Sequence, residues 1–486
     1  MSNDIKLNHV EPYVWEVPRS GEMLVPGRIY GDEAIVEHLL EDIRAGKEWN
    51  ALKQVVNVAC LPGIQKASLA MADVHPGYGF PIGGVGAFDI ETGVVSVAGV
   101  GFDINCGVRV MATPLRLADL EPKKEQLAEE LFRVIPAGVG SEGSLRLTEK
   151  EIDQVLVKGA RFCLERGMGV EDDLAHVEER GCIAGADPST VSHRAKQREL
   201  RQVGTLGSGN HYLEVQHVTK VYDEQAPKAY GLKEDQILVA IHCGSRALGH
   251  QIGTDYLKSL EQASRKYGIP IRDKELVCAP ITSPEGKRYF AAQNAGINVA
   301  FANRQALAHL TRQALVKVFG LAPEQARTFY EVGHNNAKME THTVDGRTVK
   351  LVVHRKGATR AFGPGRPELP PEYQPIGQPV LVGGTMGTAS FVLRGTEKGM
   401  AETFGSAIHG AGRTMSRQQA KRQWRGTDLV RKLAAQGILI KSRHMAGVAE
   451  EAPGAYKDVT EVVDVMHNAG INAKVLMAKP LICVKG

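Results

Sequence analysis

Histidine, cysteine and aspartate side chains recur beside glycine along this sequence. Glycine turns and strand ends of this kind are where binding and catalytic residues are usually built, because the backbone can turn sharply there. The segments that share the pattern are GVGFDINCG (99–107), GTLGSGNHYLE (204–214), IHCGSRALGH (241–250), VGHNN (332–336) and IHGAGR (408–413). Five of their side chains are candidate metal ligands, namely Asp103, Cys106, His211, His242 and His334.

One thiol, one carboxyl and three imidazoles make a mixed set of soft and hard ligands. Such a set suits Mn²⁺, Zn²⁺, Co²⁺ or Fe²⁺ better than Mg²⁺ or Ca²⁺, which prefer oxygen ligands throughout. The three-residue spacing of Asp103 and Cys106 can aim both side chains at one point in a turn, and a thiolate can bridge two ions. The competing interpretation is plain packing, since a lone cysteine is usually a core residue. We keep the plain interpretation for His217, His250, His309 and His444.

His409 stands among small residues, which leave room for a ligand to approach its ring. An accessible imidazole can be a metal ligand, a general base or a nucleophile. A basic cluster follows it and could hold phosphates, although such a cluster is ordinarily a solvated helix face. Its members are Arg413, Arg417, Lys421, Arg422 and Arg425.

Two glycine-rich segments could hold phosphates through their backbone. The loop GGTMGTAS (383–390) follows an apolar run and exposes several N–H groups, although it lacks the GK[ST] ending of a P-loop and a plain tight loop is an equally good interpretation. The segment GVGSEG (138–143) matches GxGxxG. We reject a dinucleotide site there, because Pro136 interrupts the preceding strand and the next helix begins only near Thr148. The GxSxG and HExxH motifs are absent.

The elements that must position these residues alternate loosely between helix and strand. Periodicity and capping signals predict helices over Asp32–Arg44, Glu121–Val134, the segment after a Thr148–Glu151 capping box, Asn294–Phe319 (ending at Gly320) and Val459–Asn468. Apolar runs predict strands over Gln54–Cys60, Gly93–Val100, Val108–Thr113, Gln236–His242, Val349–His354 and Pro379–Val382. The Pro-rich stretch Phe362–Pro379 could link two domains, but candidate site residues lie on both sides of it. We therefore expect an α+β chain with mixed sheets.

Composition excludes several classes of protein. The chain has 486 residues, 43% of them hydrophobic, so it can bury a sizeable core and is not collagen, a coiled coil or a disordered chain. A net charge of +4 is not the strong positive field of a nonspecific nucleic-acid binder. Seven scattered cysteines without a CxxC pair indicate a reducing compartment. Without a signal-peptide core or a run of about 18 apolar residues, we expect a cytoplasmic protein with no membrane span.

Together these motifs resemble the RtcB family of RNA-splicing ligases. The similarity covers nearly the whole chain, from DVHPGYGFPIGG (73–84) through FDINCGVR and GSGNHYLE to HGAGR and the final Lys485–Gly486. It implies a single domain over residues 1–486, with mixed sheets around a deep polar cleft. It also implies an enzyme that joins an RNA 3′-phosphate or 2′,3′-cyclic phosphate to a 5′-hydroxyl, using GTP, two Mn²⁺ ions and a guanylated histidine.

The resemblance also implies a role for individual residues. The first Mn²⁺ would be held by Asp103, Cys106, His242 and His334, and the second by Cys106 and His211, with His409 as the nucleophile that takes GMP. Glu214, Ser390 and Lys485 would read the guanine between the rings of Tyr212 and Tyr456. The implied nucleotide site as a whole is Asn210, His211, Tyr212, Glu214, His334, Asn335, Gly383, Gly384, Thr385, Met386, Ser390, His409, Gly410, Ala411, Gly412, Tyr456 and Lys485. The implied RNA contacts are Arg246, Arg413 and Arg417.

In the implied reaction, water opens a cyclic phosphate, GMP passes from His409 to the RNA 3′-phosphate, and the 5′-hydroxyl then displaces GMP. Two other hypotheses use the same metal ligands: a two-metal phosphodiesterase or other hydrolase, and an RNA-binding protein with a structural metal. Only the ligase requires His409, Glu214 and Lys485 together. Transfer-RNA halves and broken RNA ends are both compatible substrates. The native metal, the oligomeric state and any need for an archease-like activator stay open.

Overall fold

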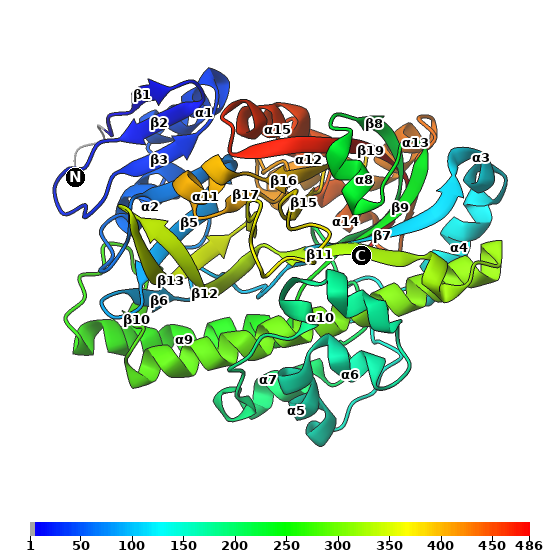
Figure 1. Ribbon diagram of the computed structural model, residues 1–486, viewed down its shortest axis with the longest axis horizontal. Coiled ribbons are helices and arrows are strands. Elements are labelled where there is room, and N and C mark those ends of the chain that lie inside the picture. Colours follow the sequence, from blue (N-terminus) through cyan, green and yellow to red (C-terminus); the bar gives the residue numbers. More distant parts are fainter. Residues whose placement is uncertain (1–4) are drawn as a thin grey trace.

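Two large sheets hold most of the strands of the computed structural model, which describes residues 5–486 (Figure 1). The first sheet has the order β1 (Asn8–Glu11), β2 (Val14–Val17), β3 (Gly27–Tyr30), β4 (Ser68–His75), β5 (Ile82–Asp89), β13 (Arg347–Lys356) and β12 (Asn335–Val344). The second has the order β11 (Arg327–Gly333), β7 (Gly107–Arg116), β9 (Gln236–Cys243), β8 (Tyr212–Val221), β19 (Asn472–Lys485), β16 (Ser390–Gly395) and β15 (Pro379–Val382), with β18 (Leu439–Ser442) beside β19.

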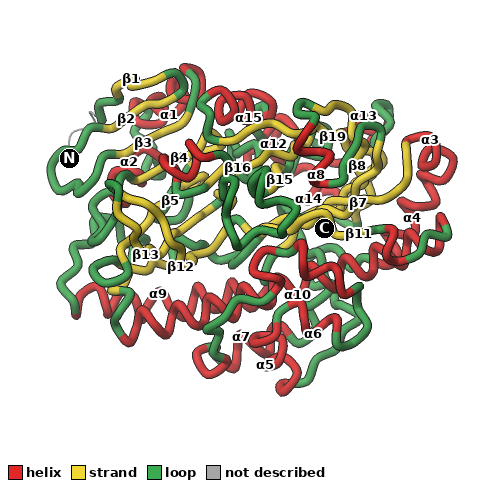
Figure 2. The backbone as a smooth tube through the Cα atoms, viewed as in Figure 1, coloured by secondary structure: helices red, strands yellow, loops and turns green. Residues whose placement is uncertain are grey.

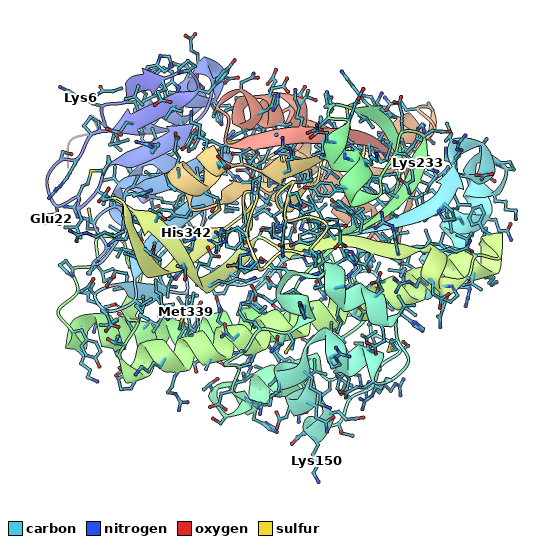
Figure 3. The ribbon with its side chains drawn as sticks, viewed as in Figure 1. Lys6, Glu22, Lys150, Lys233, Met339 and His342 are labelled. Carbon is cyan, nitrogen blue, oxygen red and sulfur yellow. The ribbon has the colours of Figure 1, made fainter. Side chains whose placement is uncertain are left out.

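Most strand pairs are antiparallel, but β3 lies parallel to β4 and β18 parallel to β19. Two short pairs join β10 (Cys278–Pro280) to β6 (Val94–Ser96) and β14 (Ala358–Arg360) to β17 (Ser406–Ile408). Along β12 the side chains alternate between the two faces, so that Met339 is 62% exposed whereas His342 is buried (Figure 3). This alternation is typical of a strand with one face on the core. The mixed sheets and the helices confirm the predicted α+β class.

Helices line the lower long edge of the molecule, and further helices lie along its upper edge, as the red segments of Figure 2 show. The α-helices are α1 (Glu33–Arg44), α2 (Ala51–Val58), α3 (Leu117–Leu120), α4 (Lys124–Val134), α5 (Glu149–Lys158), α6 (Ala160–Leu164), α7 (His193–Glu199), α8 (Gln225–Tyr230), α9 (Arg246–Lys266), α10 (Pro284–Phe319), α11 (Glu397–Thr403), α12 (Arg417–Gln423), α13 (Gly426–Ala434), α14 (Met445–Glu450) and α15 (Val459–Asn468). Helices α9 and α10 lie side by side along the lower edge, with α5, α6 and α7 packed against them (Figure 1).

The longest helix, α10, has 36 residues and spans about 54 Å at 1.5 Å per residue. It begins at Pro284, before the predicted Asn294, because Ser283 caps it by accepting a hydrogen bond from Gly286 N and proline suits the first helical position. It ends as predicted at Gly320, whose φ of +71° favours glycine. Most of its residues are buried, polar ones included, because α5, α6 and α9 pack against it on the outer side, so α10 supports the interior along most of its length.

The strand predicted over Gln54–Cys60 is wrong, because these residues belong mainly to α2. The valines of this segment favour a strand. However, Asn50 begins a helix by accepting a hydrogen bond from Lys53 N at 3.1 Å, and helical spacing buries Val55 and Val58. The strand predicted over Gly93–Val100 is too long, since β6 ends at Ser96 and the chain then turns.

The other predicted helices and strands are confirmed within a few residues. Asp32 caps α1, and the Thr148–Glu151 capping box begins α5. The Pro-rich stretch Phe362–Pro379 is not a linker, because Phe362, Leu369 and Tyr373 within it are buried. The GxGxxG segment is a loop with no helix directly after it, as the rejection of a dinucleotide site requires. All seven cysteines are free, and no helix within residues 5–486 is long and apolar enough to cross a bilayer.

A candidate metal and nucleotide site

Four neighbouring strands of the second sheet bring their ends to one edge. Gly107 at the start of β7 pairs with Gly333 at the end of β11 and with Cys243 at the end of β9. Tyr212 at the start of β8 pairs with His242. Because these neighbours are antiparallel, the residues at or just outside these ends converge. They are Asp103, Cys106, His211, His242 and His334, the five predicted ligands.

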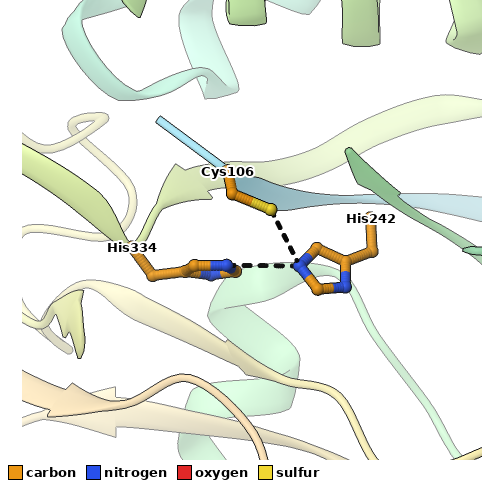
Figure 4. Close-up of side chains that lie close together, drawn as sticks. All are labelled: Cys106, His242 and His334. Carbon is orange, nitrogen blue, oxygen red and sulfur yellow. Dashed lines mark hydrogen bonds between the residues drawn. The ribbon is translucent and has the colours of Figure 1, made fainter. Parts of the chain in front are cut away.

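Three of the ligands form one buried group (Figure 4). Cys106 Sγ lies 3.3 Å from His242 Nε2, and His242 Nε2 lies 3.2 Å from His334 Nε2. All three side chains therefore point their ligand atoms at the same small space. A convergence of one sulfur and two imidazole nitrogens suits a transition-metal ion.

Cys106 also belongs to a second group, with Asp103 and His211. His211 Nε2 lies 2.7 Å from Asp103 Oδ2 and 3.3 Å from Cys106 Sγ. The Nδ1–H of His211 faces the carbonyl of Leu206 at 3.0 Å, which leaves Nε2 as the ligand atom. The shared thiol agrees with a bridging role, but Asp103 lies against His211 and not, as the resemblance implies, in the group of His242 and His334.

Burial sets the protonation of these side chains. Burial and the neighbouring histidines hold the pKa of His242 and His334 well below the usual range, so both imidazoles are neutral. Burial raises the pKa of the Cys106 thiol to about 12. Burial would lower the pKa of His211, but Cys243 and Asp103 outweigh it and raise that pKa well above its ordinary value. The thiol therefore keeps its proton near pH 7 unless a cation displaces it.

Helix α10 holds the loops that carry these ligands. Asn303 Oδ1 accepts a hydrogen bond from Gly204 N at 2.7 Å, and its Nδ2 donates to Gly244 O at 3.1 Å. The next residue, Arg304, donates from Nη1 to Asn105 O at 2.7 Å and to Cys243 O at 2.6 Å. Two adjacent side chains of one helix thus fix the backbone on both sides of the candidate ligands.

His409 lies beside the same group, with its ring centroid 4.8 Å from that of His334. It follows β17, and its Nδ1 donates to Asp73 Oδ2 at 2.7 Å. The same carboxylate oxygen accepts from the backbone N–H of His409 at 2.9 Å. A ring held with Nδ1–H toward a carboxylate presents the lone pair of Nε2 on its other side.

One cavity of about 340 Å³ joins the metal group to His409. Of the seventeen residues in the implied nucleotide site, those that line it are Asn210, Tyr212, Glu214, His334, Asn335, Gly383, Gly384, Thr385, Met386, His409, Gly410, Ala411, Gly412, Tyr456 and Lys485. His211 and Ser390 lie outside the lining. Residues from both sides of the Pro-rich stretch thus meet in one space of the size that small ligands occupy.

Of the three implied guanine-reading residues, all buried, Glu214 and Lys485 line the cavity and Ser390 does not. Burial raises the pKa of Glu214 to about 7, against the opposing effects of Gln216 and Lys485. Lys485 is buried, and its Nζ lies 6.0 Å from the centroid of the Tyr212 ring. Ser390 Oγ accepts hydrogen bonds from Gly384 N and from Gln216 Nε2, both at 3.1 Å. Ser390 therefore stabilises the 383–390 loop on the side away from the cavity.

The sequence is similar to those of known proteins. Residues 54–486 match the family model described as tRNA-splicing ligase RtcB. The chain belongs to the RtcB family. It is 51% identical to the tRNA-splicing ligase RtcB of Archaeoglobus fulgidus, over 99% of each chain, and 50% identical to that of Thermococcus kodakarensis, over the full length of both. The RtcB protein of Pyrobaculum aerophilum is 45% identical, over 99% of this chain and 100% of its own.

Sequence reasoning missed one prominent partner in this RtcB-family site, Asp73. Its signal was weak, because Asp73 lies inside the buried strand β4 and 336 positions from His409. It also missed Glu451, a buried carboxylate that accepts a hydrogen bond from Tyr456 Oη. The contact between Asp73 and His409 does not follow from local spacing, whereas Glu451 lies only five residues from Tyr456.

The three arginines implied as RNA contacts of the RtcB family are already held by protein groups. Arg246 donates from Nε to Thr205 Oγ1 at 3.2 Å and does not line the cavity. Arg413 donates to Tyr456 Oη at 2.8 Å and stacks 4.7 Å from the centroid of that ring. Arg417 pairs with Glu451 at 3.2 Å, and its side chain is still 51% exposed. The structure thus gives Arg413 a local role in holding Tyr456.

Proposed function

We propose that this RtcB-family chain is a GTP- and Mn²⁺-dependent RNA ligase. It joins RNA 3′-phosphate or 2′,3′-cyclic-phosphate ends to 5′-hydroxyl ends through guanylated His409. The observation that carries the proposal is the hydrogen bond between His409 Nδ1 and Asp73, at the cavity that the candidate metal ligands His242 and His334 also line. A metal-bound hydrolase requires no histidine oriented in this way.

Two metal ions fit the donor set. Cys106, His242 and His334 would hold one ion, and Asp103, Cys106 and His211 the other. When bound, the ions supply positive charge that offsets the charge of the phosphates. The mixed thiolate, imidazole and carboxylate donors are compatible with Mn²⁺, which we propose as the native ion.

The chain's own residues then carry the first transfer. His409 Nε2 attacks the α-phosphorus of GTP, a nitrogen–phosphorus bond forms, and the bond to the pyrophosphate leaving group breaks. Asp73 holds the imidazole in the orientation this attack needs and stabilises the positive charge that develops on the ring. The mostly small residues Gly383–Met386 and Gly410–Gly412 line the cavity and leave room where the phosphates would lie.

Two further transfers complete the reaction. Water first opens any 2′,3′-cyclic phosphate to a 3′-phosphate. An oxygen of that phosphate attacks the phosphorus of the histidine-bound GMP, and the nitrogen–phosphorus bond breaks. The RNA 5′-hydroxyl then attacks the activated 3′-phosphate, forms the new phosphodiester and releases GMP, while its proton passes to a base or to water.

Guanine selection would come from Glu214 and Lys485, with Tyr212 and Tyr456 as stacking surfaces. A carboxylate accepts from the N1–H and N2–H groups of guanine, and an ammonium donates to O6. Ser390 acts in this proposal by supporting the loop. The relatives are named tRNA-splicing ligases, so we propose tRNA halves as substrates, with broken RNA ends as a second source and an archease-like protein as a candidate activator. The site spans Asp73 to Lys485, which supports one domain over residues 1–486.

The test incubates the protein with Mn²⁺ and α-labelled GTP. We expect an acid-labile label on the protein that is lost in His409→Ala and kept in His193→Ala, a matched control whose side chain is 75% exposed. Absence of label on the unsubstituted protein across several divalent metals and pH values would contradict the proposal. Opening of cyclic phosphates without GTP would then favour the hydrolase.

A further inference from the structure

The aromatic side chains that line the cavity fall into two groups. Tyr212 and Tyr456 belong to the proposed guanine site. Tyr78 and Phe102 line the same cavity but have no part in that site. Within the described part of the chain, no ring of one group contacts a ring of the other. The second group therefore needs its own explanation.

Tyr78, Phe102 and His250 form one aromatic surface. The ring centroids of Tyr78 and Phe102 are 5.3 Å apart at an interplanar angle of 71°, and those of Phe102 and His250 are 5.3 Å apart at 32°. Tyr78 and Phe102 are partly buried, whereas His250 is exposed. The surface thus leads from solvent into the cavity. Phe102 directly precedes the candidate ligand Asp103, so the surface also borders the metal group.

The backbone of α9 packs closely against the Phe102 ring and fixes its position. Gly253 lies inside α9, and a Cβ at this position would come 2.7 Å from Phe102 Cδ1. Glycine is unfavourable inside a helix, so the close approach of the Phe102 ring explains its presence here.

A buried ammonium and a carboxylate hold the turn that carries Tyr78. Lys356 Nζ donates to Tyr78 O at 2.7 Å and to Phe80 O at 3.0 Å. Glu275 accepts a hydrogen bond from Gly79 N at 2.9 Å. Side chains fixed in this way are preorganised for a ligand, because little conformational freedom is lost on binding.

We propose that the surface of Tyr78, Phe102 and His250 stacks against the terminal nucleobase of an RNA end that is being joined. The inference rests on the proposed function, because an RNA end has to enter this cavity to reach His409. Single-stranded RNA is commonly bound by stacking of its bases on aromatic rings. Stacking accepts any base, which suits an enzyme that joins ends of different sequence.

The test measures single-turnover sealing by protein that already carries GMP. One substrate pair has a stable abasic analogue in place of the nucleotide at the 3′-phosphate end, and another has it at the 5′-hydroxyl end. These two arms identify which end supplies the base. The variants are Phe102→Leu, which keeps an apolar side chain without a ring face, Phe102→Tyr, which keeps the ring, and His250→Ala at an exposed position.

We expect the unsubstituted protein to seal the abasic substrate about tenfold more slowly at one of the two ends, as loss of one stacked base predicts. Phe102→Leu should seal the complete substrate about tenfold more slowly and show no further loss with the abasic one, and Phe102→Tyr should restore the rate. Trp49→Leu, which removes an exposed ring outside the cavity, is the matched control.

The outcomes separate the two proposals. Absence of label from GTP on the unsubstituted protein would refute the ligase itself. Normal labelling with no abasic effect at either end would overturn only the stacking inference. An abasic loss that stays tenfold in Phe102→Leu would also overturn it, because the base would then be bound elsewhere. If Phe102→Leu does not fold, His250→Ala and the abasic arms on unsubstituted protein decide the question.

Discussion

Two buried polar regions of this protein differ in how their charges are paired. Around α10, Asp173 accepts from Arg312 Nη1 at 2.7 Å and from Gln305 Nε2 at 2.8 Å. Glu331 pairs with both Arg109 and Arg304. In the group of Cys106, His242 and His334, by contrast, imidazole faces imidazole and thiol. The charges of the first region are paired within the protein, whereas the second region has the converging donor atoms of a metal or ligand site.

Burial of polar groups therefore does not identify a functional site by itself. Buried charges are normally paired, and the α10 region obeys that rule with guanidinium and carboxylate groups. A buried group of ligand atoms that converge on one point, as in Cys106, His242 and His334, indicates a site for an ion or a ligand. Arg304 contacts both regions, since it pairs with Glu331 and donates to the backbone at Asn105 and Cys243. The paired region thus supports the unpaired one.

The largest expected effect is that of Cys106→Ala, which tests whether the second region binds metal. We expect GTP labelling to fall by at least about three orders of magnitude, because both metal groups lose a shared ligand. The free energy of unfolding without metal should change by less than about 1.5 kcal/mol, since a small buried thiol is replaced by a small apolar group. Labelling is measured with α-labelled GTP and stability by urea titration. Normal labelling would show that Cys106 is not a ligand.

The opposite result is expected for Asp173→Asn in the paired region. Removal of one partner leaves the Arg312 guanidinium buried without its countercharge and should lower the free energy of unfolding by about 3 kcal/mol. Labelling per folded molecule should stay within about twofold. An unchanged urea midpoint would contradict the structural role of this ion pair.

The loss of stability in Asp173→Asn should also depend on pH. Burial would raise the pKa of Asp173, but Arg312 and Arg109 outweigh it and hold that pKa well below its usual range. The carboxylate therefore stabilises the fold fully above the unfolded pKa of about 3.9, and the stabilisation is lost as the pH falls below that value. The difference between Asp173→Asn and the unsubstituted protein should shrink below about pH 4 in urea titrations.

Asp73→Asn is an intermediate case, because it removes the charge of a carboxylate that bonds His409 beside the candidate metal ligands. We expect labelling to slow by about a hundredfold, because the amide can still orient His409 but cannot balance positive charge on its ring. Mn²⁺ affinity should not change, since Asp73 belongs to neither metal group. A parallel loss of metal binding would show that Asp73 acts on the ligands and not on His409.

The smallest expected effect is the number of protons that the protein releases when metal ions bind. Because burial raises the pKa of Cys106 to about 12, and Cys243 and Asp103 outweigh burial and raise that of His211, binding of two ions should release about one proton from each of these two ligands and strengthen as the pH rises. His242 and His334 are already neutral and should add none. Calorimetric titration of Mn²⁺ in buffers of different ionisation enthalpy measures the release, and no release would exclude the thiolate as ligand.

The sequence was most informative where residue type and a local signal coincide. Glycine turns beside Asp103, Cys106 and His409 identified candidate site residues, and caps at Asp32 and Thr148 identified helix starts. Asp73 was missed because its contact with His409 joins β4 to the residue after β17, which belongs to a different sheet and lies 336 positions away, so local spacing does not reveal it. The segment over Gln54–Cys60 was predicted wrongly because its cap and its burial outweighed the strand preference of valine.

Helix α10 makes the chain unequally tolerant of length changes. One residue inserted between Pro284 and Asn303 would turn everything after it by about 100° around the helix axis. Asn303 and Arg304 would then face away from the two loops they hold, although no residue of the cavity had been altered. An insertion in the exposed turn at Gly346 would displace nothing comparable. The outer turns can therefore change in length, whereas the residue count along α10 is fixed by the bonds of Asn303 and Arg304 to the loops beside the candidate ligands.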